Sequence, residues 1–253
     1  MNDKLIFSHE RVDDLQLQGL KLIQNPGGFC FGVDAVLLAD YASKSIRKSI
    51  HVLDLCTGSG IVPVLLSAKT QAEKITGIEI QKTVAQMACR SVKLNRLEHK
   101  ISIVCDDLKN AAERFGKSSF QYITCNPPYK KAGSGILNRA DETMIARHEI
   151  LCSLDDIIRV SSIILEPLGK LCLIHRPDRL VDIITAMKHY GIEPKRLRFV
   201  HPYPSKTASM ILIEGTRHGK PQLFLDPPLY IYEKPGVYSK EIQMIYEREE
   251  LQL

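Results

Sequence analysis

Residues 52–60 read Val-Leu-Asp-Leu-Cys-Thr-Gly-Ser-Gly. The apolar run that begins at His51 and ends at Cys56 is typical of a parallel strand buried on both faces. Two glycines follow it, and the apolar residues over 61–69 then predict a helix, with Pro63 tolerated in its first turn. A strand, a glycine turn and a helix in this order indicate the first unit of an α/β fold with a mostly parallel sheet.

The glycine turn is also a candidate ligand site. Gly58 and Gly60 allow the backbone to approach a ligand closely, and the helix behind them offers free N–H groups. The next predicted strand, 74–80, carries Glu79, which is 19 residues beyond Gly60 and is placed to accept hydrogen bonds from ribose hydroxyls. A purely structural turn is the alternative interpretation.

The spacing of the glycines helps to identify the ligand. It is G-x-G rather than the G-x-G-x-x-G of a dinucleotide site, which argues against an oxidoreductase. The strand also carries Asp54, whose carboxylate would repel a pyrophosphate and attract a cationic amino-acid group. The pattern therefore favours S-adenosylmethionine over NAD.

The next two units follow the same plan. Residues 82–95 predict an amphipathic helix, and 101–105 predict a third strand, which ends in two carboxylates. We assign Asp107 to the adenine end of the cofactor and Asp106 to capping the turn. A solvated loop acid is the alternative for either residue.

A fourth predicted strand, 120–125, is followed by Asn126-Pro127-Pro128-Tyr129. Two consecutive prolines cannot sit inside a central strand, so the chain leaves the sheet here in a stiff loop. Open α/β sheets place their chemistry at the carboxyl ends of strands. The amide, the two free carbonyls and the aromatic ring of this loop could together grip a planar amino group.

The flanking segments complete the expected architecture. Residues 11–31 predict a small β-hairpin, and 35–43 predict a helix with Asp34 as its N-cap. Phe31 is expected to touch the cofactor, and a merely structural edge is the alternative.

Later elements are predicted as a helix over 154–165, a strand over 170–175, a helix over 180–190, and an antiparallel pair of strands over 195–200 and 209–214. We expect one domain with an N-terminal hairpin and helix (1–45), a core (46–216) and a C-terminal extension (217–253).

Composition and charge narrow the class of protein. The 253 residues carry a net charge of +5, which is compatible with an RNA partner. The seven cysteines include no Cys-x-x-Cys pair, which favours reduced thiols in a cytoplasmic protein and no metal site. No signal peptide and no apolar run of the roughly 18 residues of a membrane helix is found. Nothing in the composition predicts the oligomeric state.

Basic residues gather in two places. Residues 191–220 hold six Lys or Arg against two acids, which makes this stretch a candidate surface for RNA phosphates. The loop after Tyr129 carries further cations that could hold phosphates near the target base. The residues we assign to RNA are Lys130, Lys131, Arg147, Lys195, Arg196 and Arg198. Solvated cations on an edge strand are the alternative.

These motifs together resemble a known group of enzymes. Residues 52–60, Glu79, Asp107 and Asn126-Pro127-Pro128-Tyr129 are similar to class I S-adenosylmethionine-dependent methyltransferases that act on an exocyclic or amide nitrogen. Within that group, the chain resembles the bacterial tRNA1(Val) adenine-37 N6-methyltransferases. The closer resemblance is carried by Phe-Cys-Phe-Gly-Val-Asp-Ala-Val-Leu-Leu at 29–38, Ala-Arg-His-Glu at 146–149, and the stretch 201–215. The resemblance spans most of residues 10–240.

The resemblance implies a Rossmann-like fold with a seven-stranded, mostly parallel sheet and an antiparallel last strand. It implies methyl transfer from S-adenosylmethionine to adenine N6 in tRNA by a direct in-line reaction. Asn126, Pro127 and Tyr129 are then the expected catalytic residues. The expected cofactor-binding residues are Phe31, Asp54, Cys56, Gly58, Gly60, Glu79, Asp107 and Asn126.

Other acceptors share the same loop motif. Guanine N2 of rRNA and glutamine N5 of a release factor are alternative targets. Only a short segment precedes the core, whereas an N-terminal helical recognition domain would favour the protein substrate. A non-catalytic RNA-binding module is a further alternative, but intact Asp54, Gly58, Gly60 and Glu79 argue against it.

Overall fold

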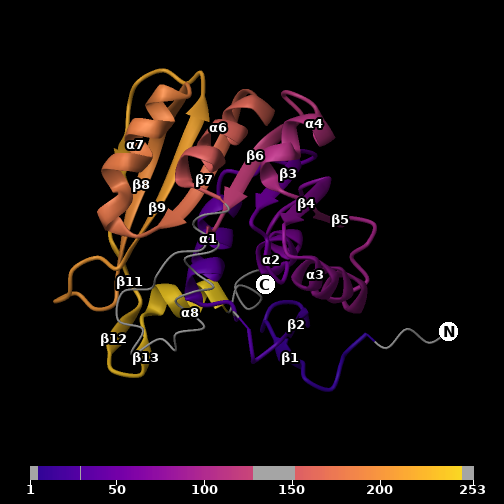
Figure 1. Cartoon of the computed structure of the whole chain (residues 1–253). Coiled ribbons are helices and arrows are strands. Elements are labelled where there is room, and N and C mark those ends of the chain that lie inside the picture. Colours follow the sequence, from indigo (N-terminus) through magenta and orange to yellow (C-terminus); the bar gives the residue numbers. More distant parts are fainter. Residues whose placement is uncertain (1–4, 29, 128–151, 247–253) are drawn as a thin grey trace.

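A computed structural model describes residues 5–28, 30–127 and 152–246 (Figure 1). Its centre is a twisted sheet in the order β8-β9-β7-β6-β3-β4-β5. The strands are β3 (His51–Leu55), β4 (Lys74–Glu79), β5 (Ile101–Cys105), β6 (Phe120–Cys125), β7 (Leu165–His175), β8 (Ile192–His201) and β9 (Met210–Arg217). Only β9 runs antiparallel to its neighbours among these seven. The predicted seven-stranded arrangement with an antiparallel last strand is confirmed.

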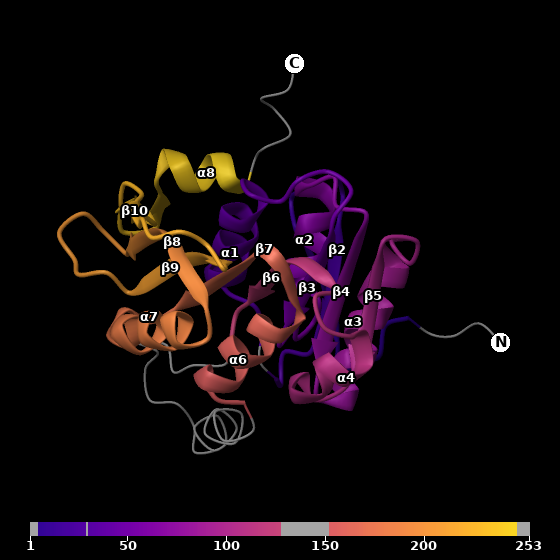
Figure 2. The same cartoon turned by 90° about the horizontal axis from the view of Figure 1, so that it is seen from above.

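Helices cover both faces of the sheet, as Figure 2 shows. One layer consists of α1 (Val33–Ser43), α2 (Ile61–Lys69) and α3 (Lys82–Leu94), and the other of α4 (Ala111–Phe115), α6 (Leu154–Ile164) and α7 (Leu180–His189). Successive side chains of β3 point to opposite faces of the sheet, and each face has its own hydrophobic core. Val52 packs in the core beneath α1, and Leu53 packs in the core beneath α6. Asp54, two residues after Val52, therefore shares the face covered by α1 and α2.

The N-terminal hairpin lies against α3. It consists of β1 (Arg11–Asp14) and β2 (Lys21–Gln24), which pair antiparallel as predicted. The buried Ser91 Oγ accepts a hydrogen bond from Ile23 N at 3.0 Å, and Asn95 Oδ1 accepts one from Lys21 N at 2.8 Å. The side chains of α3 thus satisfy backbone groups of β2 and hold the hairpin in place.

The predicted N-cap of α1 is wrong. The helix begins at Val33, and Gly32 is its N-cap, in extended backbone and without a side-chain hydrogen bond. Asp34 lies in the first turn of the helix and is buried. The sequence rule pointed to Asp34 because aspartate is a preferred cap, but the buried stretch of α1 already includes Asp34, and the helix begins two residues earlier than predicted.

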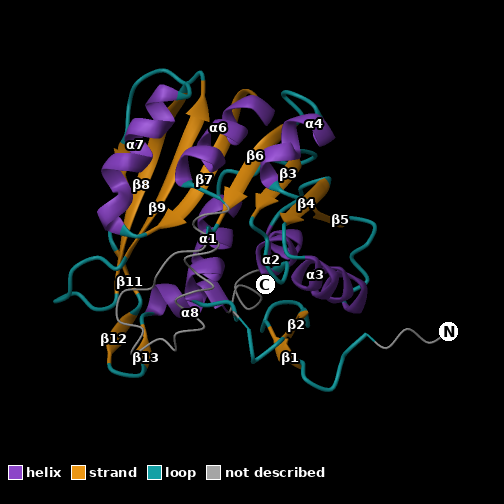
Figure 3. Cartoon of the chain, viewed as in Figure 1, coloured by secondary structure: helices purple, strands orange, loops and turns teal. Residues whose placement is uncertain are grey.

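The C-terminal extension adds strands that the sequence did not predict. It contains β10 (Phe224–Leu225), β11 (Leu229–Tyr230), β12 (Tyr232–Lys234), β13 (Val237–Tyr238) and α8 (Lys240–Tyr246). Both β10 and β11 pair parallel with β8, which makes the described sheet nine-stranded. Strands of two residues have no readable periodicity, so only their contact with β8 identifies them. Figure 3 shows β12, β13 and α8 below the edge at which β6 and β7 end.

The β4 strand passes close beneath the turn after β3, and Gly77 makes this approach possible. A Cβ atom at Gly77 would lie 2.7 Å from Thr57 Oγ1 and 2.9 Å from Ile103 Cδ1. Real Cβ atoms do not come this close to other heavy atoms. Because Gly77 has no side chain, the turn after β3 can lie close against β4.

We expect Gly77→Ala to lower the free energy of unfolding by about 1–3 kcal/mol, because the added methyl overpacks the space below Thr57. Gly28→Ala is the matched control, since a Cβ there makes ordinary contact at 3.6 Å. The control should stay within about 0.5 kcal/mol of the wild type. Urea unfolding followed by circular dichroism measures both values. Equal stability of the two variants would contradict the proposed steric constraint.

Candidate active site

The turn that joins β3 to α2 has backbone angles that favour glycine. Gly58 has φ +55° and Gly60 has φ +83°, and Gly60 is the N-cap of α2. A Cβ at Gly60 would also lie 3.3 Å from Ala88 Cβ. Thr57 N donates to Ile78 O at 3.0 Å, which holds the turn against β4. The N-terminus of α2 is thus fixed at the carboxyl edge of the sheet, where helix N–H groups can meet a ligand.

Glu79 ends β4 and is 6% exposed. Its Oε2 accepts a hydrogen bond from Gly58 N at 3.0 Å, and its Oε1 accepts one from Gln81 N at 2.9 Å. Oε1 also accepts a hydrogen bond from Gln81 Nε2 at 3.4 Å. A carboxylate oxygen has two lone pairs, so Oε2 can accept a further bond from a ligand hydroxyl. The sequence predicted Glu79 as a ribose acceptor, and the structure adds that it also holds the glycine turn.

Asp54 is the fourth of the five residues of β3, next to the carboxyl end of the strand, and is 1% exposed. Burial raises its pKa to about 7, because the charged form loses its water, while a hydrogen bond from Thr124 opposes this shift and the nearby Glu79 adds to it. Thr124 Oγ1 donates to Asp54 Oδ1 at 2.6 Å. Sequence reasoning missed Thr124, although the register of β3 and β6 pairs it with Asp54.

Asn126 follows β6 at the same edge of the sheet. Its Oδ1 is buried and has no hydrogen-bond partner among the described residues. A buried acceptor without a partner costs about 1–3 kcal/mol, so such atoms in native proteins point to a bound group. Pro127 is buried beside it. Pro128 and the predicted stacking residue Tyr129 lie outside the described residues.

The two acids after β5 both hold the turn that follows them. Asp106 Oδ1 accepts from Asp107 N at 2.8 Å and from Asn110 Nδ2 at 2.9 Å, so its side chain holds the turn, but the capping role predicted for Asp106 falls to Asp107. Asp107 Oδ1 accepts from Lys109 N at 2.9 Å and caps the 3-10 helix η1 (Leu108–Asn110). Asp106 N donates to Glu79 O at 3.1 Å, so this turn lies beside the end of β4. The assignment of Asp107 to adenine stays a prediction.

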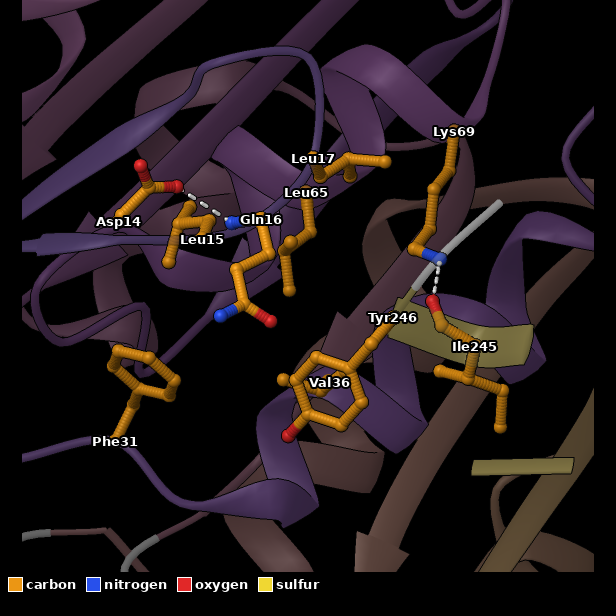
Figure 4. Close-up of a pocket in the computed structure, with 10 residues that line it drawn as sticks. All are labelled: Asp14, Leu15, Gln16, Leu17, Phe31, Val36, Leu65, Lys69, Ile245 and Tyr246. Atoms are coloured by element: carbon orange, nitrogen blue, oxygen red, sulfur yellow. Dashed lines mark hydrogen bonds between the residues drawn. The ribbon is translucent and has the colours of Figure 1, made fainter. Parts of the chain in front are cut away.

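Cys56 and Phe31 are the remaining residues predicted to touch the cofactor. Cys56 follows β3 with φ +57° and is half-buried. Phe31 precedes α1 and lines a small pocket of about 50 Å³ that Val36 and Tyr246 also line (Figure 4). Lys69, at the far end of this pocket, donates to Ile245 O at 2.9 Å. Contact of Phe31 or Cys56 with the cofactor stays a prediction.

The predicted phosphate-binding cations of β8 bind other parts of the chain. Arg196 Nη2 lies 3.0 Å from Asp226 Oδ2, and its guanidinium lies 4.3 Å from the centre of the Tyr41 ring. Arg198 is 8% exposed and its Nη1 lies 2.7 Å from Glu241 Oε1. These arginines fasten the C-terminal extension to the sheet. Lys195 Nζ donates to Lys220 O at 2.9 Å. The structure does not describe Lys130, Lys131 and Arg147.

The comparisons with known proteins agree with this geometry. The family model of the methyltransferase small domain matches residues 19–178, which is more than half of the chain. The chain belongs to the methyltransferase small domain family. This membership confirms the predicted class of enzyme, an S-adenosylmethionine-dependent methyltransferase.

Two relatives of the methyltransferase carry the same name. A Porphyromonas gingivalis protein named tRNA1(Val) (adenine(37)-N6)-methyltransferase is 30% identical over 243 residues, which cover 93% of this chain and 91% of the relative. A Shewanella halifaxensis protein of the same name is 29% identical and covers 84% of this chain and 88% of the relative.

Solved structures show the fold. A predicted O-methyltransferase from Agrobacterium tumefaciens has a TM-score of 0.67 at 22% identity, covering 84% of this chain and 95% of that one. M. jannaschii TYW2, solved in complex with AdoMet, has a TM-score of 0.57 at 10% identity, covering 83% and 86%. At these identities the likeness concerns the fold alone, and it confirms the predicted Rossmann-like architecture.

Two further findings concern membrane-spanning helices and metal-binding groups. Within the described ranges, the helices are too short or too polar to cross a membrane. The same part of the chain brings together no group of three or more His, Cys, Asp or Glu side chains that suits a metal ion.

Arg198→Ala should lower the free energy of unfolding by about 1.5–3 kcal/mol, because the hydrogen bonds of a charged group to Glu241 and Pro227 are lost. Limited proteolysis should then cleave the extension (217–253) faster. Lys195→Ala is the control and should change stability by no more than about 0.5 kcal/mol. Thermal unfolding of both variants checks this. Unchanged stability of Arg198→Ala, with weaker RNA binding, would instead support the phosphate role.

The pKa of Asp54 predicts a pH dependence of stability. Between pH 4 and 7 the folded protein keeps a proton on Asp54 that the unfolded chain has lost, since the pKa of this carboxyl rises from its usual 3.8 to about 7. The contribution of Asp54 to stability should therefore fall as the pH rises through this window, by at most about 1.4 kcal/mol per pH unit, and level off above it.

The neutral variant Asp54→Asn isolates this effect from other titrating groups. Urea unfolding at pH 5, 6, 7 and 8 should show the wild type losing stability relative to the variant up to about pH 7. Parallel stability curves for the two proteins would show that Asp54 ionises at its usual pH.

Proposed function

We propose that the chain transfers a methyl group from S-adenosylmethionine to the exocyclic N6 of adenine in RNA, with adenine 37 of tRNA1(Val) as the target. The observation that carries this proposal is the buried Asn126 Oδ1, which has no partner among the described residues and lies at the carboxyl edge of the sheet. The shared name of the relatives from two genera supports the choice of adenine and of tRNA.

The cofactor would lie across the ends of β3, β4 and β5. Glu79 Oε2 has a lone pair left for a ribose hydroxyl, and Asp107 is the candidate at the adenine end. The turn from Cys56 to Gly60 would receive the amino-acid part. A cationic group near Asp54 would favour the ionised form of this carboxyl. Phe31 would close the site from the N-terminal end of α1.

The chemistry requires placement rather than a strong base. When bound, S-adenosylmethionine supplies an electrophilic methyl group. The lone pair of an adenine amino group is delocalised into the ring, which makes this nitrogen a weak nucleophile. Asn126 Oδ1 and the carbonyl of Pro127 would accept its two N–H groups, so that the lone pair localises and points at the methyl carbon. Tyr129 would stack on the base, and the proton leaves to water after transfer.

Partner and location follow from the same proposal. An unpaired base in a loop is cheaper to extract than a base in a duplex, which favours the anticodon loop of tRNA as the substrate. All seven cysteines are free, which suits a reducing compartment. We therefore place the methyltransferase in the cytoplasm, with tRNA as its partner.

Asn126→Ala should lower kcat by about 100-fold or more, because one of the two acceptors for the amino group is lost. Its affinity for S-adenosylmethionine should stay near that of the wild type. The control is Asn110→Ala, which removes an amide at the same edge whose side chain, in the part of the chain that the structure describes, bonds to Asp106 alone. Turnover with tritiated cofactor and isothermal titration provide the two values. Wild-type turnover by Asn126→Ala would remove this residue from the reaction.

The acceptor is tested directly with RNA. Purified protein should form N6-methyladenosine in an unmodified tRNA1(Val) transcript and none in a transcript with guanine at position 37. Mass spectrometry of digested nucleosides identifies the product. Methylated guanine, or methylation of a release factor with no reaction on tRNA, would refute the choice of adenine. tRNA from a strain that lacks the gene should lose the same nucleoside.

A further inference from the structure

Four tyrosines form a row on the C-terminal side of the sheet, which we call the tyrosine ladder (Tyr203, Tyr232, Tyr238, Tyr246). The ring centres of Tyr203 and Tyr232 are 5.5 Å apart, with 31° between the ring planes. Tyr232 and Tyr238 are 5.1 Å apart at 10°, and Tyr238 and Tyr246 are 5.9 Å apart at 22°. The last two pairs are thus stacked, whereas Tyr203 is tilted against Tyr232, and all three ring distances lie in the range that aromatic pairs prefer.

The tyrosine ladder lies at the edge of the sheet that carries Asn126. Both β7 and β8 run antiparallel to β9, so β8 ends at the same edge as β6 and β7. Tyr203 lies in the loop that follows β8. Ile231 N donates to His201 O, and Tyr232 N donates to Pro202 O, each at 2.9 Å, which fastens β12 to this loop. Figure 1 shows β12, β13 and α8 below this edge.

No ring of the ladder is fully buried. Tyr246 is half-buried and lines the small pocket with Val36 and Phe31 (Figure 4). Tyr238 is 39% exposed, and Tyr203 is half-buried at the other end, with Tyr232 behind it. Folding alone would bury such rings, because exposed aromatic surface costs free energy.

Exposed cations surround the ladder. Lys206, Lys234 and Lys240 are exposed, and none of them forms an ion pair with a residue in the described ranges. Glu233 is the exposed acid beside them. The arginines of β8 differ, because Asp226 and Glu241 already neutralise them. The cations near the ladder therefore remain available to phosphates.

We propose that the tyrosine ladder binds unpaired bases that neighbour the target adenine, with the first base stacked on Tyr203 and phosphates at Lys206, Lys234 and Lys240. The proposal rests on the proposed function, since it assigns this surface to the RNA substrate. Stacking on an aromatic ring tolerates any base, because every base has a π-face. Bases held beside a target keep the loop open while that target enters the site.

The test is the affinity for an unmodified 17-nucleotide anticodon stem-loop, measured by fluorescence anisotropy. Tyr203→Ala should weaken binding by about 5- to 150-fold, the range found for loss of one stacked base. Tyr203→Leu keeps an apolar side chain without a π-face and should show the same loss. Tyr203→Phe should bind within twofold of the wild type. Cofactor affinity should be unchanged in all three.

Tyr190→Ala is the matched control, because Tyr190 follows α7 and precedes β8 at the opposite edge of the sheet. Its affinity for the stem-loop should equal that of the wild type. Thermal unfolding of each variant distinguishes a lost contact from a damaged fold.

The salt dependence of the affinity for the stem-loop distinguishes base stacking from phosphate contacts. Lys206→Ala should reduce the slope of log Kd against log salt concentration by about 0.7–0.9, the value for one lost phosphate contact. Tyr203→Ala should leave this slope unchanged, and Lys206→Arg should restore it. If the loop had a merely structural role, both Lys206→Ala and Tyr203→Ala would lower the affinity, and the salt slopes of the two variants would not differ.

The two proposals fail in different ways. If the wild type binds the stem-loop without methylating it, the proposed function falls and the ladder is judged on binding alone. If the wild type methylates tRNA and Tyr203→Ala or Tyr203→Leu binds as tightly, the ladder proposal is overturned while the function stands. Equal loss in Tyr203→Phe would also overturn it, since a hydroxyl contact would then replace stacking.

Discussion

The hydrogen bond from Gly58 N to Glu79 Oε2, 3.0 Å long, joins the two strand ends that form the cofactor side of the site. It requires the positive φ angles of the glycine turn, which place N–H groups over the edge of the sheet. It also requires Gly77, because any side chain there would push Thr57 away from β4. The same carboxylate thus shapes the turn and retains a lone pair on Oε2 for a ligand, so fold and cofactor site depend on one contact.

Two buried polar groups, Asp54 and Asn126, lie where the cofactor side of the site meets the side that would hold the methyl acceptor. Asp54 is held by Thr124 beneath the turn, and Asn126 presents an acceptor that the described residues leave unsatisfied. Both groups lie at or next to strand ends, where a ligand can replace the water that folding removed. This arrangement lets β3 and β4 position a methyl donor while β6 positions the nitrogen that receives it.

The C-terminal extension changes the interpretation of the basic charge. Arg196 and Arg198 look like surface cations in the sequence, yet each is neutralised by a carboxylate from the extension. A charge that is paired and partly buried has lost most of its attraction for a phosphate. Lys206 and its exposed neighbours keep theirs, and they lie beside aromatic rings at the edge that carries Asn126. The extension therefore moves the candidate RNA surface from the outer strand to the active-site edge.

The sequence by itself determined the parallel core, the glycine turn, Glu79 and the loop at Asn126, because strand period, glycine and proline act over a few residues. Local patterns also misplaced the start of α1 at Asp34 and missed the two-residue strands β10 and β11, which have no periodicity of their own. Only the tertiary structure decided that Thr124 supports Asp54, that Arg198 pairs with Glu241, and that four tyrosines stack. The first two contacts join residues 70 and 43 positions apart, and the tyrosines come from the loop after β8, from β12, β13 and α8. Packing rather than local propensity brings all of them together.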